Sequence, residues 1–217
     1  MNIQLALDRL AIERAIAIAR QAAPYVQRIE VGTSLIKQFG MDGVRSVRRA
    51  FPDHVIVADL KTFDNAAYEF DMCFDAGADE ATVMGAAPPV TVEAFLNAAA
   101  RRGKQAIIDL LHTSEEEGER LAAYRDAVFC VHVSKDEQES AGGSAQTAAG
   151  ERSPLLRLKR QGLRTAVAGG ITLEALRRLG PLRPDIAIVG SAIAQADDPA
   201  AAARAFQAMA TLCANEG

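Results

Sequence analysis

Three charged side chains lie within six positions of one another in segment 59–64, which reads Asp-Leu-Lys-Thr-Phe-Asp. The segment follows a wholly apolar run at residues 55–58, which indicates a buried strand. On a strand, Asp59 and Lys61 share one face because side chains two positions apart point the same way. Burying charged groups is costly unless they are paired. The segment is therefore either a salt-bridged strand end or the centre of the protein's chemistry.

The whole chain has the composition of an ordinary soluble globular protein. Its 217 residues are 49% hydrophobic and 24% charged, with a formal net charge of −4. No stripe of Lys and Arg indicates a nucleic-acid partner. No apolar run approaches the roughly 18 residues of a membrane span, and the first residues carry no basic leader. Cys73, Cys130 and Cys213 are far apart and form no metal or disulfide spacing, so we expect a cytoplasmic protein.

Short apolar runs alternate with amphipathic helical segments along the chain, and no linker interrupts them. The expected strands cover residues 3–7, 28–31, 55–60, 80–84, 105–110, 127–131, 164–168 and 186–189. This pattern predicts a single (β/α)₈ TIM barrel over residues 1–217, at the short end of the size range for that fold. A doubly wound open sheet is the alternative. The first strand-to-helix turn, residues 6–10, lacks the glycines that a dinucleotide-binding fold places there.

Functional residues of a barrel lie where the strands end and the following loops begin. Each expected strand carries a charged, histidine or glycine residue at or just after its carboxyl end. In chain order these are Asp8, Glu30, Asp59 with Lys61, Gly85, Asp109, His132, Gly169 with Gly170, and Gly190 with Ser191. We expect them to surround one mouth of the barrel.

Glu30 and Asp59 are candidate ligands of a divalent cation. They end neighbouring strands, so their oxygens could meet at one ion, and hard oxygen ligands suit Mg²⁺ or Mn²⁺. The other interpretation is a pair of buried carboxylates that Lys61 neutralises.

Lys61 and His132 are the candidate groups for moving charge and protons. Lys61 could form a Schiff base only with a lowered pKa, but acids on either side raise its pKa and favour the ammonium form. We therefore interpret Lys61 as an electrostatic stabiliser or proton donor. His132 suits general acid or base work, although a histidine at a strand end can also be a hydrogen-bonded core residue.

Glycines follow the seventh and eighth expected strands, where many barrels bind phosphate. Gly169, Gly170 and Gly190 would let backbone amides approach an oxyanion, although any tight turn also uses glycine. Residues 140–153 are rich in small residues and show no strand or strong helix period. They are a candidate mobile loop over the active site, or a plain flexible loop.

Six short motifs carry a resemblance to a known family. They are Leu-Asp at 7–8, Glu-Val-Gly-Thr at 30–33, Asp-Leu-Lys-Thr-Phe-Asp at 59–64, Ala-Gly-Ala-Asp at 76–79, Val-Ala-Gly-Gly-Ile at 167–171 and Val-Gly-Ser-Ala-Ile at 189–193. With them, the chain resembles the orotidine monophosphate decarboxylase superfamily over nearly its whole length. Within it, the chain is most similar to the 3-hexulose-6-phosphate synthases and next to the 3-keto-L-gulonate-6-phosphate decarboxylases.

The resemblance implies a Mg²⁺-dependent, homodimeric lyase that acts through the 1,2-enediolate of a sugar phosphate. The roles it implies are metal binding by Glu30 and Asp59, catalysis by Asp8, Lys61, Asp64, Asp109 and His132, and substrate or phosphate binding by Lys135, Gly169, Gly170, Gly190 and Ser191. Asp8 would support Lys61 and the substrate, and Asp64 would reach into the partner subunit's site.

A few positions separate the activities within this family. The synthases join formaldehyde to D-ribulose 5-phosphate, and the chain resembles them at Thr62, Asp109, Ala168 and Ser191. This reaction is the leading hypothesis. Lys135 keeps the positive charge of an arginine that is typical of the decarboxylases, so decarboxylation of 3-keto-L-gulonate 6-phosphate is the alternative. Loss of the phosphate-binding arginine at Ser191 and the long loop before Pro154 motivate a third hypothesis, a non-catalytic sugar-phosphate sensor.

Overall fold

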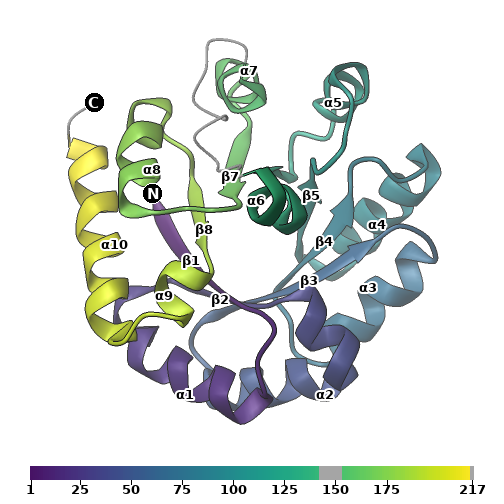
Figure 1. The fold of residues 1–217 in the computed structure, drawn as a ribbon. Helices are drawn as coiled ribbons and strands as arrows, with labels where there is room; N and C mark the ends of the chain where they lie inside the picture. The colour runs from purple at the N-terminus through teal and green to yellow at the C-terminus, as the bar shows by residue number, and fades with distance from the viewer. Residues whose placement is uncertain (142–152, 216–217) are drawn as a thin grey trace.

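The chain forms a closed barrel of eight strands in the computed structural model, which describes residues 1–141 and 153–215 (Figure 1). The strands are β1 (Asn2–Leu7), β2 (Arg28–Val31), β3 (Val55–Thr62), β4 (Glu80–Met84), β5 (Gln105–Asp109), β6 (Val128–His132), β7 (Arg164–Ala168) and β8 (Ile186–Val189). Every neighbouring pair is parallel, and β1 pairs with β8. The predicted TIM barrel is confirmed, and the open sheet is excluded.

Helices connect the strands and surround the barrel (Figure 1). They are α1 (Ile12–Ala22), α2 (Thr33–Ala50), α3 (Ala66–Asp75), α4 (Pro89–Arg102), α5 (Glu115–Leu121), α6 (Lys135–Ala141), α7 (Pro154–Arg160), α8 (Leu173–Leu179), α9 (Ser191–Ala194) and α10 (Pro199–Asn215), with 3₁₀ turns at η1 (Ala23–Tyr25) and η3 (Gly180–Leu182). In Figure 1, α6 lies in front of the strands and inside the ring of outer helices. Among the helices that the structure describes, none combines the length and apolar character needed to cross a bilayer.

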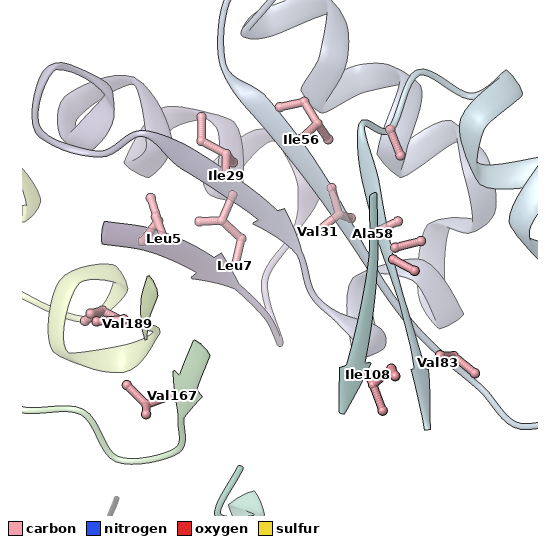
Figure 2. Close-up of a cluster of buried hydrophobic side chains, with 14 of the residues drawn as sticks. Leu5, Leu7, Ile29, Val31, Ile56, Ala58, Val83, Ile108, Val167 and Val189 are labelled. Atoms are coloured by element: carbon pink, nitrogen blue, oxygen red, sulfur yellow. The ribbon is translucent and has the colours of Figure 1, made fainter. Parts of the chain in front are cut away.

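Two apolar layers hold the barrel together, because successive side chains of a strand point to opposite faces. The outer layer packs strands against helices, and Figure 2 shows Leu5, Leu7, Ile29, Val31, Ile56, Ala58, Val83, Ile108, Val167 and Val189 within it. The inner layer fills the barrel with Val57, Ile107, Val128, Cys130, Ala166, Ala168 and Ile186. Burial on both faces explains why strands such as β6 and β8 read as nearly continuous apolar runs.

The strand bounds agree closely with those expected from the sequence. Four strands, β2, β4, β7 and β8, begin and end as predicted, and the others differ by one or two residues. The largest difference is in β3, which continues to Thr62 after a register shift against β4 between Ala58 and Thr62. Within that irregular stretch Lys61 has a φ of 49°, so its backbone is left-handed rather than extended.

Candidate active site

A cavity of about 520 Å³ opens at the carboxyl ends of the strands. The predicted site residues that line it are Asp8, Glu30, Asp59, Lys61, Asp109, His132, Lys135, Gly169, Gly170, Gly190 and Ser191. The expectation that the strand ends converge on one mouth is therefore confirmed for these residues. Two predicted residues are missing from the described lining of this cavity: Asp64, and Gly85 after β4.

Lys61 lies between two carboxylates. Its Nζ is 3.2 Å from Asp59 Oδ1 and 2.5 Å from Asp109 Oδ2. The irregular backbone of β3 is held by Thr82, whose hydroxyl accepts the Lys61 amide at 2.9 Å and donates to Asp59 Oδ1 at 2.8 Å. The predicted pairing of Asp59 with Lys61 is thus present, although the strand is not regular at this point.

The charge state of Lys61 follows from these contacts. Burial alone would lower the pKa of Lys61, but the charges of Asp59 and Asp109 raise it well above its usual value. Lys61 is therefore a cation, which agrees with an electrostatic role and not with a Schiff base.

Asp109 links Lys61 to His132. Its side chain is only 2% exposed, and His132 Nδ1 lies 2.9 Å from Asp109 Oδ2. Burial alone would raise the pKa of Asp109, but the hydrogen bond and charge of His132, followed by the charge of Lys61, hold the pKa below its usual range. Asp109 therefore stays ionised and holds Nδ1 of the imidazole. Among the described residues, Nε2 of His132 has no hydrogen-bond partner, so this nitrogen can serve a substrate.

Glu30 and Asp59 form the candidate cation site. Burial, and after it the negative charge of Asp59, raise the pKa of Glu30 to about 7, while Gln4 and Lys61 partly oppose this. Asp59 is held by Thr33, whose hydroxyl lies 2.7 Å from Asp59 Oδ2. The surroundings of Glu30 neutralise its charge poorly, and such a buried carboxylate suits a divalent cation. One or two carboxylates together with the substrate can hold such an ion. The described residues contain no cluster of three or more His, Cys, Asp or Glu side chains placed to hold a metal.

Asp8 has a different contact from the one that the resemblance implies. Its carboxylate accepts from the Ser34 amide at 2.9 Å and from the Ser34 hydroxyl at 3.2 Å, so it ties β1 to the start of α2. Gly32 makes this approach feasible, because a Cβ there would lie 2.6 Å from the Leu7 carbonyl oxygen. Asp8 still lines the cavity, but it bonds to Ser34 rather than to Lys61.

The glycine ends of β7 and β8 expose backbone to the cavity. Gly169 and Gly170 have φ values of 95° and 63°, a region that favours glycine. A Cβ on Gly169 would lie 2.2 Å from the Val133 carbonyl oxygen, so no side chain fits there. Gly190 precedes α9, and Ser191 begins it. The positions predicted for phosphate binding are thus side by side in the cavity lining.

Lys135 shares a carboxylate with an arginine that the sequence analysis did not single out. Glu139 Oε1 lies 3.7 Å from Lys135 Nζ and 2.9 Å from Arg9 Nη1, and all three side chains line the cavity. Arg9 follows β1 and Glu139 belongs to α6, so the pair spans the mouth between elements that are 130 positions apart. Only the barrel brings these residues together, which is why no sequence pattern indicated Arg9.

Asp64 is exposed, and its carboxylate accepts the Asn65 amide at 2.7 Å. Beside it in the chain, Phe63 is 54% exposed and Tyr68 is 66% exposed. The predicted mobile loop at 140–153 lies mostly outside the described residues: its first two residues end α6, and Ser153 caps α7 with a bond to the Leu155 amide.

Comparison with known proteins gives concordant results. A family model described as "Orotidine 5'-phosphate decarboxylase / HUMPS family" matches residues 1–206. A 3-hexulose-6-phosphate synthase from Mycobacterium gastri is 33% identical over 212 residues, which cover 96% of this chain and 99% of that protein. The crystal structure of 3-hexulose-6-phosphate synthase from Salmonella typhimurium superimposes with a TM-score of 0.89 and 32% identity, covering 98% of this chain and 100% of that one. KGPDC from Streptococcus mutans, in a ligand-bound crystal structure, gives a TM-score of 0.89 and 26% identity, covering 98% of each chain.

Proposed function

The chain belongs to the orotidine 5'-phosphate decarboxylase / HUMPS family, and from this premise we propose that it is a lyase of the 3-hexulose-6-phosphate synthase type. The reaction joins formaldehyde to D-ribulose 5-phosphate. A proton leaves C1 of the sugar to give a 1,2-enediolate, whose C1 then bonds to the formaldehyde carbon. The new alkoxide takes up a proton, so the overall change is addition and gives 3-hexulose 6-phosphate.

The observation that carries this proposal is the chain of contacts from Asp59 through Lys61 and Asp109 to His132. An enediolate concentrates negative charge on two oxygens, and Lys61 offers a cation that its two carboxylates hold in place. Asp109 orients the imidazole of His132, so that Nε2 takes the C1 proton and returns a proton to the alkoxide.

Glu30 and Asp59 would hold Mg²⁺, or Mn²⁺ in its place, because both are buried oxygen donors that line the cavity. When bound, this ion would supply Lewis-acid stabilisation to the enediolate oxygens. Thr33 keeps one oxygen of Asp59 occupied and so limits how the carboxylate can turn.

The sugar phosphate would lie against the ends of β7 and β8. Gly169, Gly170 and Gly190 line the cavity and are only partly buried, so their backbone amides are available to a phosphate, and the Ser191 hydroxyl adds a donor. Lys135 and Arg9 supply positive charge across the same cavity. In this proposal Lys135 and Arg9 give up part of their contact with Glu139 and contact the substrate instead. Asp8 contributes to substrate binding beside them.

Asp64 belongs to the partner subunit's site in this proposal, which therefore requires a homodimer. The exposed Phe63 and Tyr68 next to Asp64 favour an interface on this side of the barrel, since large apolar side chains at a surface are typical of association sites.

The second candidate is decarboxylation of 3-keto-L-gulonate 6-phosphate. Lys135 favours it, since a cation at the cavity edge could protonate a carbanion after carbon dioxide leaves. The similarity to KGPDC from Streptococcus mutans supports the same alternative.

The test follows formaldehyde loss from a mixture of protein, D-ribulose 5-phosphate and Mg²⁺. We expect turnover by the wild type, loss of at least about 100-fold in kcat for Lys61→Met, and unchanged activity for Lys37→Met, which alters an exposed lysine of α2. Carbon dioxide release from 3-keto-L-gulonate 6-phosphate without any formaldehyde loss would favour the decarboxylase instead.

A further inference from the structure

A chain of polar side chains runs through the barrel beneath the candidate cation site. Glu80 of β4 pairs with Arg28 of β2, and Arg28 Nε donates to Gln4 Oε1 of β1 at 2.7 Å. Gln4 Nε2 in turn donates to Glu30 Oε2. The chain therefore ends on one of the two carboxylates proposed to hold the metal.

Burial isolates this chain from water. Gln4, Arg28 and Glu80 are 1%, 5% and 7% exposed, and the apolar inner layer fills the barrel beside them. A buried ion pair contributes little net stability, because desolvation offsets the attraction, and apolar residues of similar size often replace such a pair at no cost. Folding alone therefore gives a weak reason for Arg28 and Glu80 at this depth.

The contacts determine which way the Gln4 amide faces. A guanidinium group has only hydrogen-bond donors, so the Gln4 atom that meets Arg28 must be the carbonyl oxygen. The amide NH₂ group then faces Glu30, whose Oε2 is kept as an acceptor. Glu80 completes the arrangement by holding the other end of the guanidinium.

We propose that Arg28, anchored by Glu80, is a positioning residue that orients Gln4 and through it aims the Glu30 carboxylate at the bound divalent cation. Partners of metal ligands commonly act in this way and change metal affinity about 10- to 100-fold. The inference rests on the proposed function, because it takes Glu30 as a metal ligand.

The test measures Mn²⁺ binding to the metal-free protein by titration calorimetry, with no substrate present. The double variant Arg28→Met/Glu80→Met removes the pair without leaving a buried unpaired charge. We expect Mn²⁺ to bind about 10- to 100-fold more weakly, while the melting temperature of the metal-free protein stays at or above that of the wild type. Gln4→Met should give a similar loss. Combining it with the double variant should add nothing further, since both act through one contact.

Arg164→Met is the matched control. Arg164 begins β7 and donates to Gln105 Oε1 at 2.7 Å, another arginine-to-glutamine contact at a strand start, but it does not lead to Glu30. Its variant should bind Mn²⁺ as the wild type does. Wild-type affinity in the double variant, or losses that simply add, would overturn the inference.

Glu30→Gln separates this failure from failure of the proposed function. If Glu30→Gln loses Mn²⁺ while the double variant keeps it, only the inference falls. If Glu30→Gln binds as tightly as the wild type, or the wild type itself binds no Mn²⁺, the metal site of the proposed function falls, and the inference falls with it.

Discussion

Asp109→Asn is the substitution that most sharply separates charge from shape in the site. Asparagine fills nearly the same volume, but it removes the carboxylate that meets Lys61 Nζ at 2.5 Å and His132 Nδ1 at 2.9 Å. The neutral amide can accept from Nδ1 or donate to it, so the imidazole is no longer held in one tautomer. Lys61 then keeps Asp59 as its acidic partner, at 3.2 Å.

The magnitude follows from these two losses. A positioned general base contributes about 10²- to 10⁴-fold in rate, and misorienting it forfeits most of that factor, which is about 3–5 kcal/mol of activation free energy. We expect kcat to fall by about 10²- to 10⁴-fold. The KM for the sugar phosphate should change much less, because the ends of β7 and β8, which we propose bind the phosphate, are unaltered.

The assay is exchange of the C1 proton of D-ribulose 5-phosphate with deuterium oxide, followed by NMR with no formaldehyde present. Exchange reports proton removal alone, so Asp109→Asn should slow it by the same factor as overall turnover. Asp126→Asn, an exposed acid outside the cavity, is the control. An exchange rate within a factor of three of the wild type, in a variant with unchanged melting temperature, would refute the proposed coupling of Asp109 to His132.

Three further predictions concern other parts of the site. The pKa of Glu30 is raised from 4.5 to about 7 in the metal-free protein, and this shift corresponds to about 3 kcal/mol in the free energy of unfolding. This stability is fully present below pH 4.5 and is lost as pH rises through 7. Urea unfolding of the metal-free protein should therefore show the free energy of unfolding falling over this pH range, and Glu30→Gln should abolish that fall. Cation affinity should rise over the same pH range, because the proton must leave first. Gly169→Ala should destabilise the fold by more than about 1 kcal/mol and raise the KM for the sugar phosphate, since its Cβ would lie 2.2 Å from the Val133 carbonyl oxygen; a wild-type melting temperature and KM would contradict this. Mixing inactive Lys61→Ala and Asp64→Ala proteins should restore activity in hybrid dimers, whereas no recovery would place Asp64 outside the partner's site.

The barrel was predictable because its strands carry their own signal. Apolar runs such as those of β7 and β8 are bounded by polar or glycine residues, and the two buried faces of a barrel strand make such runs continuous. Residues at the strand ends, such as Glu30 and His132, were predictable for the same reason. Parallel strands of a barrel bring all their carboxyl ends to one mouth.

Contacts that depend on register or on distant elements were not predictable. Gln4, Arg28 and Glu80 are polar residues within strands. Arg28 lies two positions before Glu30 and Glu80 two before Thr82, so each shares a strand face with that residue. Their pairing with one another, however, requires the alignment of β1, β2, β3 and β4. The left-handed backbone of Lys61 arises where β3 shifts register against β4, which no local pattern encodes. The meeting of Arg9 with Glu139 depends on the closed barrel itself.

One measurement tests the central claim most directly. Protein, Mg²⁺, D-ribulose 5-phosphate and ¹³C-labelled formaldehyde are mixed and followed by carbon NMR. The proposed function predicts that the label moves into a hydroxymethyl carbon coupled to the sugar chain, and that Asp59→Asn or a chelator prevents this. Formaldehyde that remains unchanged with metal-replete wild-type protein would contradict it.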